Sequence, residues 1–211
     1  MVTLAAVLIG SYLLGSIPFG YLVGRLVGVD IRRAGSGNIG ATNVVRVLGK
    51  RYGYPVFACD VLKGFGTVTI AMLMALGRWP AWNSPEIFGI LAAISSVLGH
   101  LYPPWLKFKG GKGVATSAGA LLALTPVAAL IGIAIWIIVF CLTRYVSLAS
   151  ITAAVVLPIV ILIISWQDQN ETKPLIYFSA CVAALVIWRH RSNLSRLMRG
   201  TEPRFTRKRE L

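Results

Sequence analysis

Long apolar runs, separated by short charged or Pro/Gly-rich breaks, set the pattern of this chain. A helix that crosses the hydrocarbon core of a bilayer needs about 20 mostly apolar residues. The first run has neither a basic amino-terminal region nor a small-residue cleavage site, so we interpret it as a retained span rather than a signal peptide. The pattern predicts an all-α integral membrane protein, with six apolar runs: residues 1–24, 52–77, 87–105, 114–142, 146–166 and 174–188.

The positions of Lys and Arg test the number of crossings, because cytoplasmic loops are enriched in both residues. Six crossings would leave Arg144 and the arginine-rich segment 189–209 outside. Thr125 and Pro126 interrupt the fourth run, and proline disfavours helix at the residue before it. If two spans meet there, the chain has seven transmembrane helices, with the amino terminus outside and the carboxyl terminus in the cytoplasm. Of the 21 Lys and Arg residues, only Arg78 and Lys173 then lie outside, and only Lys63 lies in the membrane.

The composition agrees with a membrane protein. Of the 211 residues, 56% are hydrophobic and only 13% are charged, which is too apolar for a soluble domain of this size. The net charge of +14 could indicate nucleic-acid binding, but a soluble nucleic-acid binder carries its basic residues on a polar fold. We therefore expect the lipid bilayer as a partner and no nucleic acid.

No internal repeat, low-complexity tract or soluble domain interrupts the pattern. We expect a single membrane-embedded domain over residues 1–211, with a basic cytoplasmic tail from about residue 200. Anionic lipid headgroups would attract four basic residues of that tail: Arg204, Arg207, Lys208 and Arg209.

Two glycine-rich, basic segments lie between apolar runs, at residues 35–43 and 109–113. Glycine lets the backbone adopt positive φ and approach a ligand closely, so consecutive N–H groups can converge on phosphate oxygens. Arg46 and Lys112 add full charges beside them. The two segments therefore predict the halves of one anion site at the membrane surface. If a helix begins near Gly40, four residues also share one helical face: Asn38, Thr42, Asn43 and Arg46.

Neither segment fits a nucleotide-binding motif well. Residues 35–40 match G-x-G-x-x-G, but that fingerprint has meaning only after a strand, and this copy follows a transmembrane run. Residues 109–113 lack the order of a P-loop. Either segment alone could be an interhelical turn with lysines that contact lipid. Two such segments on the same side of the membrane favour a binding site.

Two charged residues lie within one apolar run. Lys63 follows Asp60 by three residues, which predicts an intramembrane ion pair. We favour a structural role for this pair, although charges inside a membrane are often functional. His100 lies near the cytoplasmic end of the next run without comparable polar company, and we interpret it as structural.

Further polar residues lie near the cytoplasmic ends of the last runs. His190 shares helical spacing with Asn193 and Arg196, and Ser147 and Ser150 form a similar stripe. We find no Ser-His-Asp arrangement, no metal-ligand cluster and no paired carboxylates in the sequence. Hydrolytic or metal-based chemistry is therefore poorly supported, and we expect no metal and no cofactor.

These motifs closely resemble those of the bacterial acyl-phosphate:glycerol-3-phosphate acyltransferase family. The resemblance covers nearly the whole chain, and the family's seven-span fold and cytoplasmic active site agree with the topology inferred from charge. The hydrophilic loop 167–173 and the longer basic tail depart from the family pattern, but neither touches a motif. The matching segments are residues 35–43, 60–64, 99–100, 108–116, 144–150 and 189–191, with Asn193, Arg196 and Gly200.

The resemblance implies a function in phospholipid synthesis at the bacterial cytoplasmic (inner) membrane. A fatty acyl group would pass from acyl phosphate to the 1-hydroxyl of glycerol 3-phosphate, giving lysophosphatidic acid and phosphate. A monomer is plausible, but the sequence leaves the oligomeric state open. The expected catalytic residues are Ser36, Arg46 and Lys112. Expected acyl-phosphate ligands are Ser36, Gly37, Asn38, Thr42, Asn43, Gly110, Gly111 and Lys112, and expected glycerol 3-phosphate ligands are Arg46, Lys112, Ser150, His190 and Asn193.

The reaction needs a proton acceptor for the glycerol hydroxyl, and neither glycine-rich segment contains a carboxylate. An acyl phosphate carries its own acceptor, so we hypothesise substrate-assisted transfer without an acyl-enzyme intermediate. Ser36 would then hold the phosphate, and His190 would hold the glycerol 3-phosphate.

Two other functions stay open from the sequence, an anion transporter and a non-catalytic lipid-binding scaffold. A transporter should place polar residues near the bilayer midplane and show repeat symmetry, whereas most polar groups here lie at one face. A scaffold needs only solvated basic loops, without glycines that bring backbone donors to a ligand.

Overall fold

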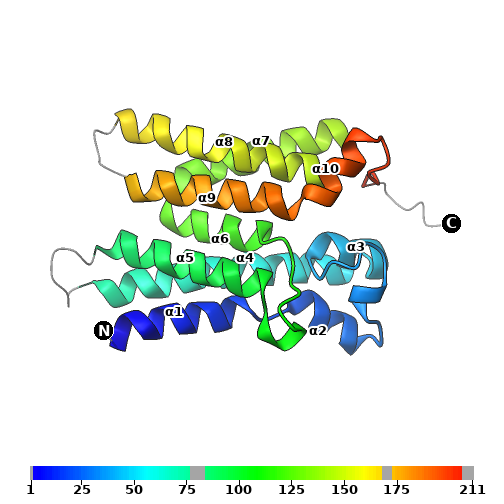
Figure 1. Ribbon diagram of the computed structural model, residues 1–211, viewed down its shortest axis with the longest axis horizontal. Helices are drawn as coiled ribbons and strands as arrows, with labels where there is room; N and C mark the ends of the chain where they lie inside the picture. The colour runs from blue at the N-terminus through cyan, green and yellow to red at the C-terminus, as the bar shows by residue number, and fades with distance from the viewer. Residues whose placement is uncertain (1, 77–83, 168–172, 206–211) are drawn as a thin grey trace. The chain divides into compact units, whose positions relative to one another are not determined.

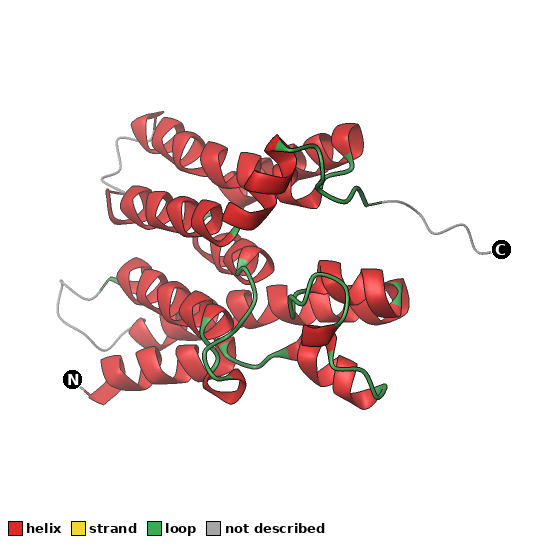
Figure 2. Ribbon diagram, turned by 45° about the vertical axis from the view of Figure 1, so that its right-hand side comes forward, coloured by secondary structure: helices red, strands yellow, loops and turns green. Residues whose placement is uncertain are grey.

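The computed structural model describes residues 2–76, 84–167 and 173–205, and every regular element in that part of the chain is a helix (Figures 1 and 2). The contacts divide the chain into two units, Met1–Pro126 and Val127–Leu211. Arg78, most of the predicted outer loop, and tail residues Arg207, Lys208 and Arg209 lie outside the described residues.

The first unit is built around one long helix, α4 (Lys50–Ala75). Helices α3 (Ala41–Leu48), α5 (Pro85–Leu101) and α6 (Val114–Leu124) pack against α4, and α1 (Val2–Gly15) packs on both α5 and α4. Helix α2 (Phe19–Leu26) also contacts α4. Two short 3₁₀ helices lie in the connections, η1 (Ile31–Arg33) and η2 (Pro104–Leu106).

The first apolar run is not one helix, as the sequence pattern predicted, because it breaks between α1 and α2. Pro18 stands directly before α2, and proline has no N–H to continue the ladder of hydrogen bonds. The break is closed by side chains: Trp105 Nε1 donates to Ser16 Oγ at 2.8 Å, and Lys63 Nζ donates to the Ile17 carbonyl at 3.0 Å. Such repair by neighbouring side chains is how membrane helices tolerate proline.

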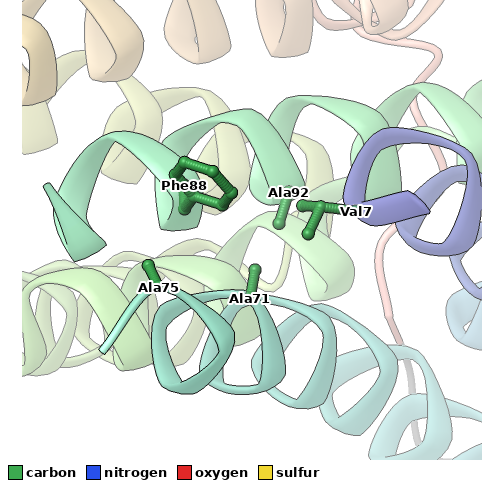
Figure 3. Close-up of a cluster of buried hydrophobic side chains, with 5 residues drawn as sticks. All are labelled: Val7, Ala71, Ala75, Phe88 and Ala92. Atoms are coloured by element: carbon green, nitrogen blue, oxygen red, sulfur yellow. The ribbon is translucent and has the colours of Figure 1, made fainter. Parts of the chain in front are cut away.

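Small side chains bring α1, α4 and α5 together. Figure 3 shows Val7 of α1, Ala71 and Ala75 of α4, and Phe88 and Ala92 of α5 in one buried cluster. The three alanines among these five residues let the helix backbones approach closely, as is usual for helices that pack inside membranes.

The second unit contains α7 (Pro126–Thr143), α8 (Val146–Gln167), α9 (Lys173–Arg189) and α10 (Arg191–Met198). Helix α8 packs on α9, and α10 contacts both. The predicted break at Thr125 and Pro126 is confirmed, because α6 ends at Leu124 and α7 begins at Pro126. Thr125 has an extended φ of −148°, as expected of a residue that precedes proline.

The helices are those of an integral membrane protein. Helix α7, for example, leaves Val127, Leu130 and Ile138 more than half exposed, as suits a surface in contact with lipid rather than water. Helix α6 has 11 residues and α9 has 17, shorter than the usual span. Five helical stretches are long and apolar enough to cross a membrane: Leu4–Leu26, Lys50–Ala75, Pro85–Leu106, Pro126–Thr143 and Val146–Trp166.

Candidate active site

Asn43 holds the first glycine-rich segment in shape. Its Oδ1 accepts from the Ser36 N–H at 2.8 Å, and its Nδ2 donates to the carbonyls of Ala34 and Asn38 at 3.0 and 2.9 Å. A further donation reaches the Ile31 carbonyl at 3.2 Å. Asn43 is buried, so these contacts fix the loop from inside. Asn43 therefore shapes this loop.

Around the buried Asn43 side chain, the loop presents polar groups at the surface. Gly35 and Gly37 have φ of +59° and +70°, a conformation that favours glycine, and they turn the chain on either side of Ser36. Ser36 and Gly37 are exposed, and Asn38 is half-buried with its Oδ1 accepting from the Gly40 N–H at 2.8 Å.

Helix α3 begins at Ala41 with Gly40 before it, which confirms the predicted helix start. Thr42 and Arg46 are four residues apart on this helix, so they share a face, and both are half-buried. The prediction of a single face for all four polar residues is wrong in part. Asn38 precedes the helix, and Asn43 is turned into the loop.

The second glycine-rich segment, residues 109–113, is hydrogen-bonded to the end of α5. Gly110 N–H donates to the Leu101 carbonyl at 2.9 Å, and Gly111 N–H donates to the His100 carbonyl at 3.1 Å. These two N–H groups therefore do not converge on a ligand as we predicted from the glycines. Lys112 is half-buried, and α6 begins directly after Gly113. The first turn of a helix leaves N–H groups without intrahelical partners, so an anion can bind there.

The predicted ion pair in α4 is confirmed. Lys63 Nζ lies 2.8 Å from Asp60 Oδ1, and both side chains are almost fully buried. The interpretation of His100 as isolated is wrong, because its Nδ1 lies 2.9 Å from the same Nζ. The sequence could not show this contact, since His100 comes from α5 and is 37 residues from Lys63.

In the second unit, Glu202 gathers polar residues at the ends of α8 and α10. Its Oε1 accepts from Ser147 Oγ and from Asn193 Nδ2, each at 2.7 Å, and its Oε2 accepts from Arg196 Nε at 2.7 Å. Burial raises the pKa of Glu202, but the hydrogen bonds from Asn193, Ser147 and Arg196 and the charge of Arg196 outweigh burial and leave the pKa below its usual value. Glu202 is therefore an anion at neutral pH.

The residues just after Glu202 are packed on the same unit. Phe205 N–H donates to the Arg144 carbonyl at 2.8 Å, and the Phe205 ring makes an edge contact with Phe140. Arg204 Nε donates to the Tyr145 hydroxyl at 3.1 Å. The basic charge of this segment predicts only a tail. The sequence gives no sign of the contacts of Glu202, because a single glutamate after a basic helix has no local signature.

Ser150 and His190, predicted ligands of glycerol 3-phosphate, are both buried. In the sequence, each lies three residues from a member of this cluster, Ser147 and Asn193. Ser150 Oγ accepts from Trp136 Nε1 at 3.1 Å and lies one turn after Ser147 on α8. His190 lies at the junction of α9 and α10, with Nδ1 2.8 Å from the Val186 carbonyl. A carbonyl only accepts, so Nδ1 carries a proton, and in a neutral ring Nε2 is then an acceptor.

The described residues contain no group of three or more His, Cys, Asp or Glu side chains that could hold a metal ion. Fold and site together define a helical membrane protein with glycine-rich basic loops suited to phosphate-bearing molecules. The chain belongs to the glycerol-3-phosphate acyltransferase family, whose model matches residues 5–200.

Relatives from three organisms carry the name glycerol-3-phosphate acyltransferase. Those of Desulforamulus reducens, Geotalea daltonii and Aquifex aeolicus are 43%, 46% and 44% identical. The alignments cover 95%, 95% and 92% of this chain and 94%, 96% and 95% of the relatives.

Two solved structures of PlsY (YgiH), an integral membrane glycerol 3-phosphate acyltransferase, are also similar. The glycerol 3-phosphate form matches with a TM-score of 0.83 and 42% identity over 96% of both chains. The lysophosphatidic acid form matches with a TM-score of 0.82 and 41% identity over 96% of this chain and 95% of the other.

Proposed function

We propose that this protein transfers a fatty acyl group from acyl phosphate to the sn-1 hydroxyl of glycerol 3-phosphate, giving lysophosphatidic acid and phosphate. The observation that carries this function is the likeness, over 96% of the chain, to an acyltransferase in forms named for glycerol 3-phosphate and lysophosphatidic acid. The first is the acceptor of the proposed reaction and the second is its product.

Seven transmembrane helices fit the proposed function, with the amino terminus outside and the carboxyl terminus in the cytoplasm. The five long stretches, together with α6 and α9, make this number. The distribution of Lys and Arg supports this orientation and places the site at the cytoplasmic face of a bacterial inner membrane. One family model covers most of both units, which supports a single acyltransferase domain with a basic tail.

The acyl-phosphate site consists of the two glycine-rich segments of the first unit. Ser36 and Lys112 contact the phosphate, and the first turns of α3 and α6 add backbone donors. Other members of this site act mainly by shaping the loops, as the hydrogen bonds of Asn43 and of the glycine N–H groups suggest. The proposed set is Ser36, Gly37, Asn38, Thr42, Asn43, Gly110, Gly111 and Lys112.

The glycerol 3-phosphate ligands combine charge with neutral polar groups. Arg46 and Lys112 neutralise the phosphate of the acceptor, and Lys112 serves both anions. Ser150, His190 and Asn193 bind and orient the acceptor. Asn193 is itself oriented by Glu202, which fits a role in positioning.

Transfer follows a substrate-assisted course. The glycerol oxygen attacks the acyl carbonyl carbon, the bond from that carbon to the phosphate oxygen breaks, and the hydroxyl proton passes to the departing phosphate. Ser36, Arg46 and Lys112 stabilise the charge that develops, so the protein supplies position and electrostatics rather than a base.

The proposed function is tested with purified protein, acyl phosphate and glycerol 3-phosphate. We expect lysophosphatidic acid and phosphate in equal amounts, and no product when an acyl thioester replaces acyl phosphate. Movement of phosphate across sealed vesicles without acyl transfer would instead show a transporter, and tight lipid binding without either would show a scaffold.

The role of His190 is tested by His190→Ala across the pH range. A positioning role predicts a raised KM for glycerol 3-phosphate, substantial residual kcat and an unchanged pH profile. Collapse of kcat with loss of a limb near neutral pH would show that His190 is the base.

A further inference from the structure

His100 is in contact with both the buried ion pair and the second glycine-rich segment. The residue lies in the last turn of α5 and is 5% exposed. One ring nitrogen, Nδ1, faces Lys63. The other, Nε2, occupies the place where a side chain of Gly111 would begin.

The ion pair fixes the orientation of this ring. Lys63 Nζ donates to the Ile17 carbonyl at 3.0 Å and lies 2.9 Å from His100 Nδ1, and it forms the ion pair with Asp60 Oδ1 at 2.8 Å. Because the ammonium only donates, Nδ1 is an acceptor and the ring proton lies on Nε2. The 3.6 Å between Asp60 Oδ1 and His100 Nδ1 agrees, since two acceptors that share one ammonium do not bond each other.

Gly111 and Gly110 are glycines for different reasons. Neither has a positive φ, so an L side chain is compatible with both backbones. A Cβ on Gly111 would overlap the imidazole of His100, and the three atoms nearest to it all belong to that ring. A Cβ on Gly110 would instead overlap the His100 carbonyl oxygen and lie 2.5 Å from Pro103 Cδ and 2.6 Å from the Leu101 carbonyl oxygen, none of which belongs to the imidazole.

We propose that His100, oriented by Lys63 and Asp60, is a positioning residue that supports the Gly110 and Gly111 backbone and so places Lys112 for phosphate binding. This inference rests on the proposed acyl transfer, because Lys112 is assigned to the substrates there. The ring acts through the loop and does not contact the reacting atoms. Gly111 is small because the ring needs its space.

The proposal is tested with a double-mutant cycle of Gly111→Ala and His100→Asn. Asparagine keeps an oxygen that can accept from Lys63 but leaves the space of Nε2 empty. We expect Gly111→Ala alone to lower kcat/KM about a hundredfold. We expect His100→Asn alone to raise the KM for one of the two substrates about tenfold, while kcat changes less than threefold. The double variant should recover to the level of His100→Asn, since the overlap is gone.

Gly110→Ala is the matched control. Its Cβ meets backbone atoms that His100→Asn does not remove, so the pair Gly110→Ala and His100→Asn should show no recovery. The KM values for acyl phosphate and glycerol 3-phosphate are measured separately, and the larger rise identifies the phosphate that the loop binds. Thermal unfolding of each variant in detergent is measured in parallel.

If the wild-type protein is active and the losses of kcat/KM from Gly111→Ala and His100→Asn are additive in the double variant, the proposal is wrong. Equal recovery of activity in the pair Gly110→Ala and His100→Asn would also contradict the proposal, because the recovery would then not come from removing the overlap with the His100 imidazole. If His100→Asn is extracted unfolded, the residue is required for the fold and the positioning role is wrong. An inactive wild-type protein with both substrates would count against the proposed function instead.

Discussion

The two units each bury one carboxylate among hydrogen-bond donors, but they bring it there in opposite ways. Asp60 lies in the middle of a long helix, and its cation Lys63 is on the same helix three residues later. Glu202 comes from an irregular segment after α10, and it reaches Ser147 across 55 residues of chain. The first arrangement is secured by helical register, whereas the second depends on the return of the chain to α8.

This difference affects what each cluster can tolerate. Asp60 and Lys63 lie in a helix that is long and apolar enough to cross a membrane, and both side chains are almost fully buried, so little solvent is available to replace a lost partner. Arg196, the cation beside Glu202, has a side chain that is 40% exposed. We therefore expect a larger loss of stability from breaking the first cluster than from breaking the second.

The largest effect is expected from Lys63→Met, which removes the cation 2.8 Å from the buried carboxylate of Asp60 and leaves only the more distant ring of His100, at 3.6 Å, to pair with it. Loss of one partner of a buried ion pair costs about 3–5 kcal/mol. Thermal unfolding and the yield of folded protein in detergent measure it. The double variant Asp60→Leu with Lys63→Met removes both charges and should recover a large part of the loss. Wild-type stability in the single variant would show that the pair does not hold this unit together.

Arg46→Ala and Lys112→Ala should separate activity from stability. Both side chains are half-buried rather than in a packed core, Arg46 on the short helix α3 and Lys112 just before α6. Losing one charge-assisted contact in the transition state costs about 2–4 kcal/mol, a hundredfold or more in rate. Unfolding temperatures should stay close to wild type. Near-normal rates in both variants would argue against the shared anion site.

A smaller effect is expected from Glu202→Ala, compared with Glu202→Gln as its control. Alanine leaves the buried donors of Ser147 and Asn193 without their acceptor, which costs about 1–3 kcal/mol. Glutamine keeps an acceptor oxygen and should lose less. The KM for glycerol 3-phosphate should rise more for alanine, because Asn193 is released. Equal effects of the two substitutions would mean that charge alone matters at this position.

The smallest effect is a dependence of stability on pH. The pKa of Glu202 is lowered in the folded protein from its ordinary value of 4.5, so its ionised form stabilises the fold. This contribution is complete above pH 4.5 and is lost as the pH falls through the folded pKa. The difference in unfolding temperature between wild type and Glu202→Gln should therefore be constant from pH 7 to pH 5.5 and shrink below pH 4.5. A difference that grows in acid would contradict the assignment.

Features that depend on local sequence could be predicted. Pro126 ends one helix and begins the next, the start of α3 follows Gly40, and Asp60 pairs with Lys63 at helical spacing. Pro18 carries the same kind of signal, but the apolar residues on both sides concealed the break between α1 and α2.

Features that depend on distant segments could not be predicted. The contact of His100 with Lys63 joins two helices, and the N–H groups of Gly110 and Gly111 turn to carbonyls of α5. A glycine-rich motif does not reveal which of its donors are already used by the fold. Nor does the sequence reveal that the amide of Asn43 is held by the loop that it shapes.

The packing of Phe205 has a practical consequence for expression and engineering. The charge of the sequence alone would suggest truncating the protein at about residue 200. That truncation would remove Glu202 and the hydrogen bond from Phe205 to Arg144. Affinity tags, fluorescent fusions and protease sites should therefore be placed after Phe205. Deletions that reach Glu202 should be treated as changes to the folded protein.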